Sequence, residues 1–458
     1  MTVDVMLAFM QALLVMTLMG FFSIELLLPP KTISRSLVWA LAPALGAGQC
    51  SFIQFLFRRP MFTVERGLLL ILLCFWLWKR RPATSSFAWM RAYRIPILNA
   101  ALYGTMLVSF AAGMMRIEHI PHGGTDGHAI WNSHARYLYR DPTSWQQHFQ
   151  NTFHPDYPLL LPSLVARGWR YAGVDLPDLG GLVGLLFPFV AIAILGTALA
   201  ELRGAAAGIF VAFTLLTTPF YMVLGTHQEA DIPLSTFVLS TIVLIYLYFK
   251  QEAPPKGLLL LAGFLAGSAA WTKNEGILFL AAASITLAVP LLWKPRAALP
   301  RVLLFLLGAS LPLAILAYFK IAIAPQTDLF QDRQLAELSA KVMDLDRYAI
   351  TFGSFLSTAW VFGQWTIPPV VPLFAFLVRR GFDWLEIGTF RWRTAAGIPL
   401  IVLSGYYCIY IITPIDLPVH LESSLNRLLM HIWPSVIFLI GLVAKTEASP
   451  PTVSPSQG

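Results

Sequence analysis

Long apolar runs, separated by short polar segments, follow one another along most of the chain. A helix that spans a membrane needs about 20 consecutive, mostly apolar residues. Thirteen runs approach this length, and they cover residues 3–28, 36–57, 64–78, 95–115, 179–200, 205–224, 232–249, 257–271, 276–293, 301–324, 353–378, 395–414 and 429–445. The pattern predicts an all-α polytopic membrane protein with about 13 transmembrane helices. Prolines and arginines interrupt the apolar stretch 154–172, so we expect it to lie in the membrane interface.

Composition agrees with this prediction and excludes a soluble globular enzyme. Hydrophobic residues make up 57% of the sequence and charged residues 12%, whereas charged residues make up about 25% of an average soluble domain. The first apolar run has no basic segment before it, so we expect a retained helix and not a cleaved signal peptide. Cys50, Cys74 and Cys408 all fall within apolar runs and match no metal-binding spacing, so we predict no disulfide.

The charges between the runs predict how the helices are oriented. Cytoplasmic loops are enriched in Lys and Arg, and placing the N-terminus outside puts most of these residues in the inner loops. Arg58, Arg59 and Arg66 do not fit, which leaves open whether the hairpin around residues 50–70 crosses the membrane fully. All nine histidines lie on or near the outer face. We therefore expect any chemistry to take place outside, and we read the net charge of +8 as a topology signal and not as a sign of nucleic-acid binding.

The largest outer segment, at about 116–178, contains the first candidate for chemistry. Asp126 follows two glycines and precedes a helical pattern that includes Trp131 and His134, which predicts a short interfacial helix. A carboxylate there can act as a general base that takes a proton from an acceptor hydroxyl. Asp is also a preferred residue for capping a helix, so both interpretations of Asp126 stay open.

The histidines of this segment can be interpreted in two ways. Asp126, His128, Asp156, Glu229 and Asp231 can converge on a divalent cation, if the fold brings them together. The spacing of His128 and His134, however, does not put them on one helical face, and no H-E-x-x-H motif occurs. Ordinary hydrogen-bonding roles for these histidines are the simpler interpretation.

Three further outer segments place charged residues beside apolar runs. Glu229 and Asp231, in GTHQEADIP, can cap the next helix or orient a sugar hydroxyl. Lys273, in WTKNEG, can belong to a tight turn or bind a lipid phosphate. Arg427, near the start of the last run, can bind a phosphate in a bidentate manner or pair with Glu422. The outer segment 325–352 has charges of both signs and fits a solvated cap.

These segments, in this order, resemble the membrane glycosyltransferases of the GT-C superfamily, in particular the aminoarabinose-transferase and protein O-mannosyltransferase branch. The early acid of the first large outer loop is matched by Asp126 in GGTDGHAIW, and a Pro-Pro-Leu-Tyr-Tyr-type segment by HPDYPLLLP, which contains Asp156. An acid before a span is matched by Asp231, a Thr-Lys-Gly-type turn by Thr272 and Lys273, and an Arg-containing segment leading to a Pro by NRLLMHIWP with Arg427. The resemblance covers roughly residues 95–445.

The resemblance implies a mechanism in which a polyprenyl-phosphate sugar is the donor. Asp126 would deprotonate the hydroxyl of a lipid, glycan or protein acceptor, and direct attack at the anomeric carbon would invert its configuration. The implied substrate-binding residues are Glu229, Asp231, Asp156, His128, Lys273, Arg427, Arg136 and Arg347. Lys273 and Arg427 would be the main cations for the leaving phosphate, and Arg136 and Arg347 would assist them. The implied location is a bacterial plasma membrane, with the site facing the periplasm.

The sequence also departs from this family. The usual paired acids of the first loop appear here as Asp126-Gly127, and three extra runs precede that loop, where the relatives have one. We therefore divide the chain into an N-terminal three-helix segment (1–94), a catalytic transmembrane module (95–445) and a short cytoplasmic tail (446–458) that we expect to be disordered. A transporter or flippase of lipid-linked sugars and an O-antigen ligase or polymerase stay open as alternatives.

Overall fold

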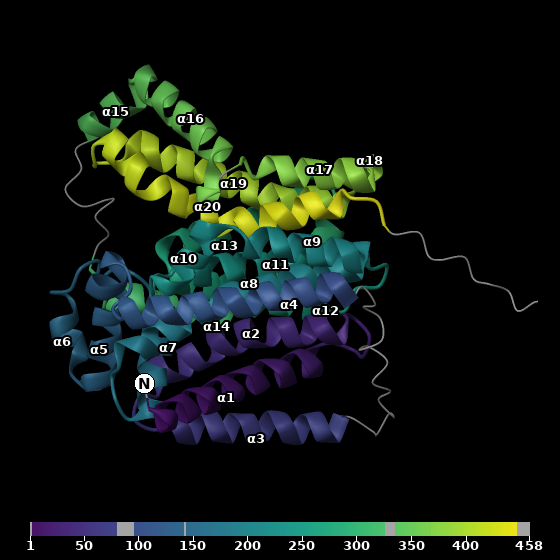
Figure 1. Ribbon diagram of the computed structural model, residues 1–458. Coiled ribbons are helices and arrows are strands. Elements are labelled where there is room, and N and C mark those ends of the chain that lie inside the picture. Colours follow the sequence, from purple (N-terminus) through teal and green to yellow (C-terminus); the bar gives the residue numbers. More distant parts are fainter. Residues whose placement is uncertain (1, 80–95, 142, 326–334, 366, 447–458) are drawn as a thin grey trace, which may run out of the picture.

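A computed structural model describes residues 2–79, 96–141, 143–325, 335–365 and 367–446 of the chain (Figure 1). The structure is 83% helical, and within these ranges the only β-type pairing is one bridge between Phe382 and Ala444. The all-α prediction is therefore confirmed. Of the predicted tail 446–458, only Thr446 lies within the described residues, and the predicted boundary at residues 94 and 95 lies outside them.

In the described part of the chain, ten helices are long and apolar enough to cross a membrane. They are α1 (Val3–Leu27), α2 (Arg35–Leu56), α3 (Met61–Lys79), α4 (Pro96–His119), α8 (Pro177–Arg203), α11 (Asp231–Lys250), α13 (Asn274–Ala288) extended by η3 (Val289–Leu292), α14 (Pro295–Ala322), α19 (Phe390–Ile412) and α20 (Leu417–Leu442). The apolar helix α12 (Lys256–Thr272) is shorter, with 17 residues. Both helices of the hairpin around residues 50–70, α2 and α3, are long enough to span.

Two of the thirteen predicted spans are not single straight helices. The run 205–224 forms α9 (Ala205–Leu216) and α10 (Pro219–Thr226), which meet at an angle of 63°. Pro219 opens α10, and because proline has no backbone N–H it cannot continue the hydrogen bonds of α9. If α9 and α10 count as one bent span, the number of candidate spans rises to eleven.

The prediction of one continuous helix over residues 353–378 is also wrong. This run is divided among α16 (Leu345–Trp360), the short 3₁₀ helix η4 (Phe362–Gln364) and α17 (Val370–Arg380). Gly363 has φ of 75° and Gln364 has φ of 59°, and neither value fits a right-handed helix. Hydropathy alone could not reveal this break, because the residues on both sides of it are apolar.

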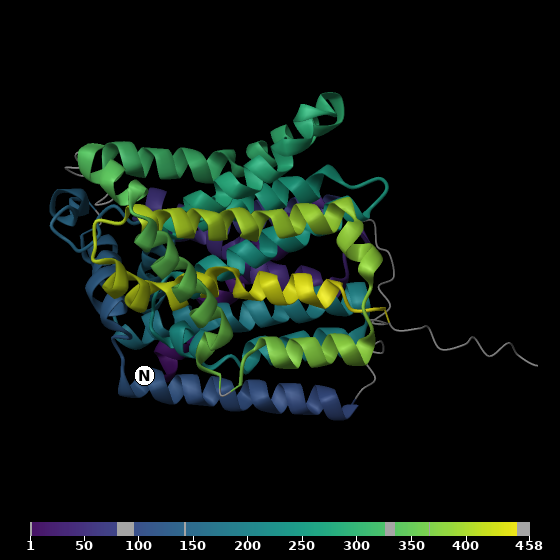
Figure 2. The same ribbon diagram turned by 90° about the horizontal axis from the view of Figure 1, so that it is seen from above.

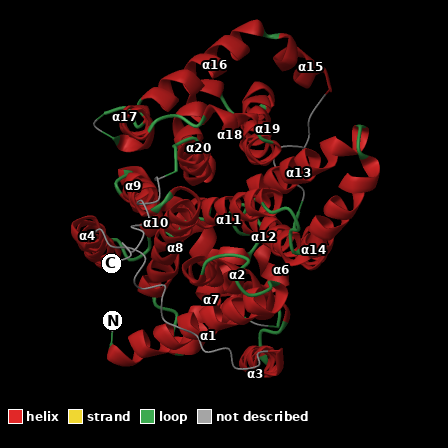
Figure 3. Ribbon diagram, turned by 90° about the vertical axis from the view of Figure 1, so that its right-hand side faces the viewer, coloured by secondary structure: helices red, strands yellow, loops and turns green. Residues whose placement is uncertain are grey.

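The long helices lie side by side with their axes roughly parallel (Figures 1 and 2). The segments predicted to be outside gather at one end, which carries α5 (Ser133–Arg140), α6 (Trp145–Phe149) and α15 (Leu335–Met343). We call this the loop end. The short helix α18 (Trp384–Gly388), from a segment predicted to be inside, lies at the opposite end. The view along the helices shows α11 near the middle, between α8, α12 and α20 (Figure 3).

The segment between α4 and α8 folds against the loop end of the helices. It contains a π-helical turn, η2 (Gly127–Asn132), which leads directly into α5, and a further helix, α7 (Leu160–Ala172). The predicted short helix therefore forms, but Trp131, His134 and Leu138 are buried within the protein. α7 is not among the span-length helices. Its Arg167 forms a buried ion pair of 2.5 Å with Glu65 of α3, which ties this segment to the N-terminal helices.

Candidate active site

Arg427 joins two acidic residues from different parts of the chain at the loop end. It lies in the third turn of α20, and its Nη1 donates to Asp126 Oδ2 at 2.6 Å and to Glu229 Oε2 at 3.1 Å. The side chain of Glu229 is 6% exposed, whereas that of Asp126 is 38% exposed. One guanidinium thus holds a buried carboxylate and a carboxylate that solvent or a substrate can reach.

Glycines allow the loop of Asp126 to lie directly on the segment of Glu229. The Gly124 N–H donates to the carbonyl oxygen of His227 at 3.0 Å. A Cβ atom on Gly124 would lie 2.5 Å from Glu229 Oε1, and one on Gly127 would lie 2.2 Å from the His227 carbonyl oxygen. Gly123 also has φ of 75°, a conformation that side chains rarely adopt. The glycines around Asp126 are therefore required by the close approach of two backbones.

His227 extends this network to α4. Arg116 Nη2 donates to His227 Nε2 at 3.0 Å, so Nε2 is the acceptor and the ring hydrogen is on Nδ1. His227 Nδ1 faces Glu229 Oε1 at 3.6 Å. Arg116, His227, Glu229, Arg427 and Asp126 form one connected series of alternating donors and acceptors. Glu229, which belongs to this series, contacts the same Nη1 atom of Arg427 as Asp126.

A second cluster lies deeper and is almost completely buried. Lys273, the single residue between α12 and α13, places Nζ 3.0 Å from Asp231 Oδ1 and 3.1 Å from Glu275 Oε1. His431 Nε2 lies 2.7 Å from the same Asp231 oxygen. Although burial alone lowers the pKa of Lys273, the carboxylates of Asp231 and Glu275 raise the pKa above its usual value. Lys273 is therefore held as an ammonium ion.

A third group connects the segment before α7 to this cluster. Asn274 Nδ2 donates to Asp156 Oδ2 at 2.7 Å, and Lys320 Nζ donates to Asn274 Oδ1 at 2.8 Å. Next to Asp156, the ring of Tyr157 stacks on Trp131 with centroids 5.6 Å apart. Burial, followed by the charge of Glu275, raises the pKa of the Tyr157 hydroxyl, so this group stays neutral. Buried aromatic rings and polar groups are thus adjacent here.

The fold brings six of the nine sequence-predicted residues into this region. Asp126, Glu229 and Arg427 are in direct contact, Asp231 and Lys273 form the deeper pair, and Asp156 reaches it through Asn274. The other three residues make different contacts. His128 packs on the His122 ring, Arg136 lies over Trp169, and Arg347 donates to the carbonyl oxygens of Tyr410 and Ile411.

The structure also bears on the alternatives for individual residues. Asp126 precedes η2 but makes no capping hydrogen bond with its side chain. Asp231 lies in the first turn of α11 and pairs with Lys273. Within the described residues, Arg427 forms ion pairs with Asp126 and Glu229, and not with the expected alternative partner Glu422. Asp126 is thus used in an ion pair and not as a helix cap, whereas Asp231 combines an ion pair with a place at the start of a helix.

A divalent cation finds no ready set of ligands in the described residues. No group of three or more His, Cys, Asp or Glu side chains there is arranged to hold a metal ion. Asp126, Glu229 and Asp231 each accept from a cationic side chain, and His128 faces His122 instead of these acids. The donor set present here therefore fits ion pairing better than metal binding.

Sequence reasoning missed several members of the site. Among them are His431, Asn274, Lys320 and Tyr406 of α19, whose hydroxyl lies 2.9 Å from His431 Nδ1. The spacing of Arg427 and His431 is a usable signal, because residues four apart lie on one face of a helix. A lysine near the end of a long apolar helix, such as Lys320 in α14, is another. The tyrosine offered no such signal in sequence.

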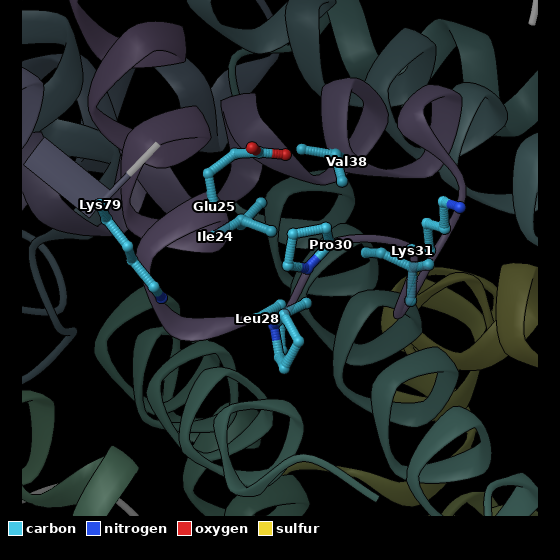
Figure 4. A pocket seen from close by; sticks show the side chains of 9 residues that line it. Ile24, Glu25, Leu28, Pro30, Lys31, Val38 and Lys79 are labelled. Carbon is cyan, nitrogen blue, oxygen red and sulfur yellow. The ribbon is translucent and has the colours of Figure 1, made fainter. Parts of the chain in front are cut away.

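A separate pocket lies at the opposite end of the protein. It has a volume of about 110 Å³ and lies where α1 ends and α2 begins, with Glu25, Pro30, Lys31 and Lys79 among its lining residues (Figure 4). Glu25 is already paired with Arg35 at 2.8 Å. The length of the helices separates this pocket from Asp126 and Arg427, so it is not part of the candidate site.

Comparison with known proteins gives one match. The family model for dolichyl-phosphate-mannose-protein mannosyltransferase matches residues 180–319, which include α8 to α13, most of α14, and the site residues Glu229, Asp231 and Lys273. No curated protein and no solved structure matches the chain. Together with the multi-pass helical fold, the family match supports the assignment of this chain to the membrane glycosyltransferases of the GT-C superfamily.

Proposed function

We propose that the protein transfers a sugar from a polyprenyl-phosphate donor to an acceptor hydroxyl at the loop end, which faces the periplasm. The observation that carries this proposal is the ion pair between Asp126 and Arg427. It places a candidate base and a candidate phosphate-binding cation 2.6 Å apart, in a chain that matches a mannosyltransferase family. A single bound donor can therefore contact both groups.

Asp126 is the group best placed to accept a proton. It is the most exposed carboxylate of the Arg427 network, with 38% of its side chain accessible. In the proposed reaction the carboxylate takes the proton of the acceptor hydroxyl, and the hydroxyl oxygen forms a bond to the anomeric carbon. The bond from that carbon to the phosphate oxygen breaks, and its electron pair leaves with the polyprenyl phosphate. A single displacement of this kind inverts the configuration.

The leaving phosphate requires cations, and Arg427 lies next to the base. Arg427 uses Nη1 for both carboxylates, and 27% of its side chain is exposed. An exposed guanidinium can bind phosphate through two parallel hydrogen bonds. Lys273 adds a positive charge from the deeper cluster. Charge that develops on the leaving oxygen is then stabilised by groups already held in place.

Lipid analysis of the purified protein tests the donor class. The protein is extracted in mild detergent, and co-purifying lipids are identified by mass spectrometry. The result expected is a polyprenyl phosphate carrying one sugar, whose mass distinguishes a hexose from a pentose. Transfer in the purified system that depends on a nucleotide sugar and proceeds without polyprenyl phosphate would overturn the proposal.

Cysteine labelling tests the proposed sidedness. Asn151 lies exposed at the loop end and Glu252 lies exposed in the segment between α11 and α12. In a cysteine-free background, a membrane-impermeant maleimide should label a cysteine at Asn151 in intact cells, and one at Glu252 only after the membrane is opened. The reverse pattern would place the site in the cytoplasm.

A further inference from the structure

His431 and Tyr406 connect two further helices to the deep ion pair. His431 lies on α20, four residues after Arg427, and its Nε2 contacts Asp231 Oδ1 at 2.7 Å. Tyr406 lies on α19, and its hydroxyl is 2.9 Å from His431 Nδ1. Both side chains of the His431–Asp231 pair are 1% exposed. Neither His431 nor Tyr406 has a place in the proposed chemistry described above.

The direction of these hydrogen bonds follows from the partners. Asp231 also accepts from the Lys273 ammonium group, so its carboxylate is the acceptor and His431 Nε2 carries the hydrogen. With its hydrogen on Nε2, a neutral imidazole accepts at Nδ1, and the Tyr406 hydroxyl donates to it. Tyr406 thereby fixes the tautomer and the orientation of the ring.

Stability alone does not account for this arrangement. A buried ion pair often contributes little, or even opposes folding, relative to apolar residues of the same volume. Here Asp231, Lys273 and His431 are all buried inside a chain rich in apolar residues. Their cluster lies directly below Arg427, because His431 and Arg427 share one face of α20. Burying this charged cluster costs free energy, and a need to hold the Lys273 ammonium group in one position explains that cost.

We propose that His431 and Tyr406 are positioning residues that hold Asp231 and, through it, Lys273 in the orientation that binds the phosphate of the lipid donor. This inference rests on the proposed function of the site. His431 and Lys273 contact the same Asp231 oxygen, at 2.7 Å and 3.0 Å. Without the imidazole N–H, that carboxylate is free to turn about its side-chain bonds. Lys273 then follows Asp231 or turns to Glu275, its other partner at 3.1 Å.

Two variants of His431 test this role. His431→Leu removes both nitrogen atoms, whereas His431→Gln keeps an N–H that can reach Asp231. We expect the leucine variant to weaken binding of a short-chain polyprenyl phosphate, and to raise the KM for the donor, by about tenfold. The KM for the acceptor should stay unchanged, and the glutamine variant should recover most of the donor affinity. A purely structural role would change both KM values together or neither.

Tyr406→Phe is the second test, and neighbouring residues provide controls. It removes the hydroxyl that orients His431, so we expect a smaller rise in the donor KM than for His431→Leu. Tyr407→Phe removes a hydroxyl that bonds to the Tyr348 carbonyl oxygen, and His420→Gln changes a histidine that bonds to Thr413. Both controls should bind the donor like the wild type.

The outcomes separate this inference from the proposed function. If the wild-type protein does not bind polyprenyl phosphate, the proposed function fails. If the wild-type protein binds it and His431→Leu and Tyr406→Phe bind it equally well, only the positioning role is overturned. If His431→Leu does not fold, then His431→Gln and Tyr406→Phe decide the question by the same binding measurement.

Discussion

Arg427 and Asp126 are 301 residues apart in the chain, yet Arg427 Nη1 donates to Asp126 Oδ2 at 2.6 Å. This ion pair joins the last long helix to the first large segment between helices. Before a donor binds, the carboxylate is held by this guanidinium. A bound phosphate would compete for the same guanidinium and leave the Asp126 oxygen free to accept from the acceptor hydroxyl. The pair therefore relates the presence of the donor to the accessibility of the base.

The first prediction is that Asp126→Asn abolishes sugar transfer and leaves folding intact. The amide can still accept a hydrogen bond from Arg427 but cannot take a proton, and a positioned general base typically contributes 100-fold or more to the rate. We expect a loss of at least about 100-fold in kcat, with normal donor binding. Asp175→Asn, which disrupts an ion pair with Arg140 away from the site, is the matched control. Full activity of Asp126→Asn in a transfer assay would exclude Asp126 as the base.

The second prediction separates the charge of Lys273 from its effect on stability. Lys273→Met leaves Asp231 buried next to an apolar side chain, and removing one partner of a buried ion pair costs about 3–5 kcal/mol. Asp231→Asn combined with Lys273→Met removes both charges and should recover much of that stability. Donor binding should stay weak in both variants, because the ammonium group is absent. Thermal unfolding in detergent and a polyprenyl-phosphate binding assay measure the two effects separately.

Donor affinity restored in the double variant would show that Lys273 acts only by neutralising Asp231. This result would contradict a direct contact between Lys273 and the phosphate. It would leave Arg427 as the cation that binds the donor.

The third prediction concerns Gly124, which lies two residues before Asp126. A methyl group on Gly124 would lie 2.5 Å from Glu229 Oε1 and 3.2 Å from His227 Nδ1, so either the loop moves or Glu229 shifts and disturbs Arg427, its partner at 3.1 Å. Gly124→Ala should therefore reduce kcat strongly while the helices remain folded. Gly168→Ala is a suitable control, because nothing lies within 4 Å of the position where its Cβ would be. Equal activity of both alanine variants would show that the position of the Asp126 loop does not matter.

The helical fold could be predicted from the sequence because apolar runs of spanning length are required wherever a helix crosses a membrane. Asp126, Asp231, Lys273 and Arg427 could also be found, because each lies in an outer segment beside such a run and matches a segment of the GT-C glycosyltransferases. Hydropathy did not reveal the break at Gly363, although the Pro368-Pro369 pair that follows it is a turn signal. Tyr406 had no such signal, since a tyrosine in a spanning helix has no distinguishing feature until its partner is known. The contact between Gly124 and Glu229 depends on two segments that meet only in the folded chain.

The last prediction is that acid destabilises the protein through His134 on α5. Its Nε2 lies 3.0 Å from the carbonyl oxygen of Phe153, while its buried Nδ1 has no partner within the described residues. Protonation would place a hydrogen and a charge at that nitrogen, so burial lowers the pKa of His134 from 6.5 to about 3. The unfolded chain, with a pKa near 6.5, then binds more protons than the folded one between these two values. Stability is therefore fully present above pH 6.5 and falls as the pH drops below it.

Between pH 7.5 and pH 5 the loss from this one group should be about 2 kcal/mol. Thermal unfolding of the purified protein, followed at several pH values in one detergent, measures this dependence. His134→Asn removes the titrating ring, so its stability should be lower at pH 7.5 but should change less on acidification. His119→Asn is the matched control, because His119 is exposed at the end of α4 and should leave the pH dependence as it is. An unchanged pH dependence in His134→Asn would mean that other groups dominate acid unfolding, and that the buried imidazole is tolerated in its charged form.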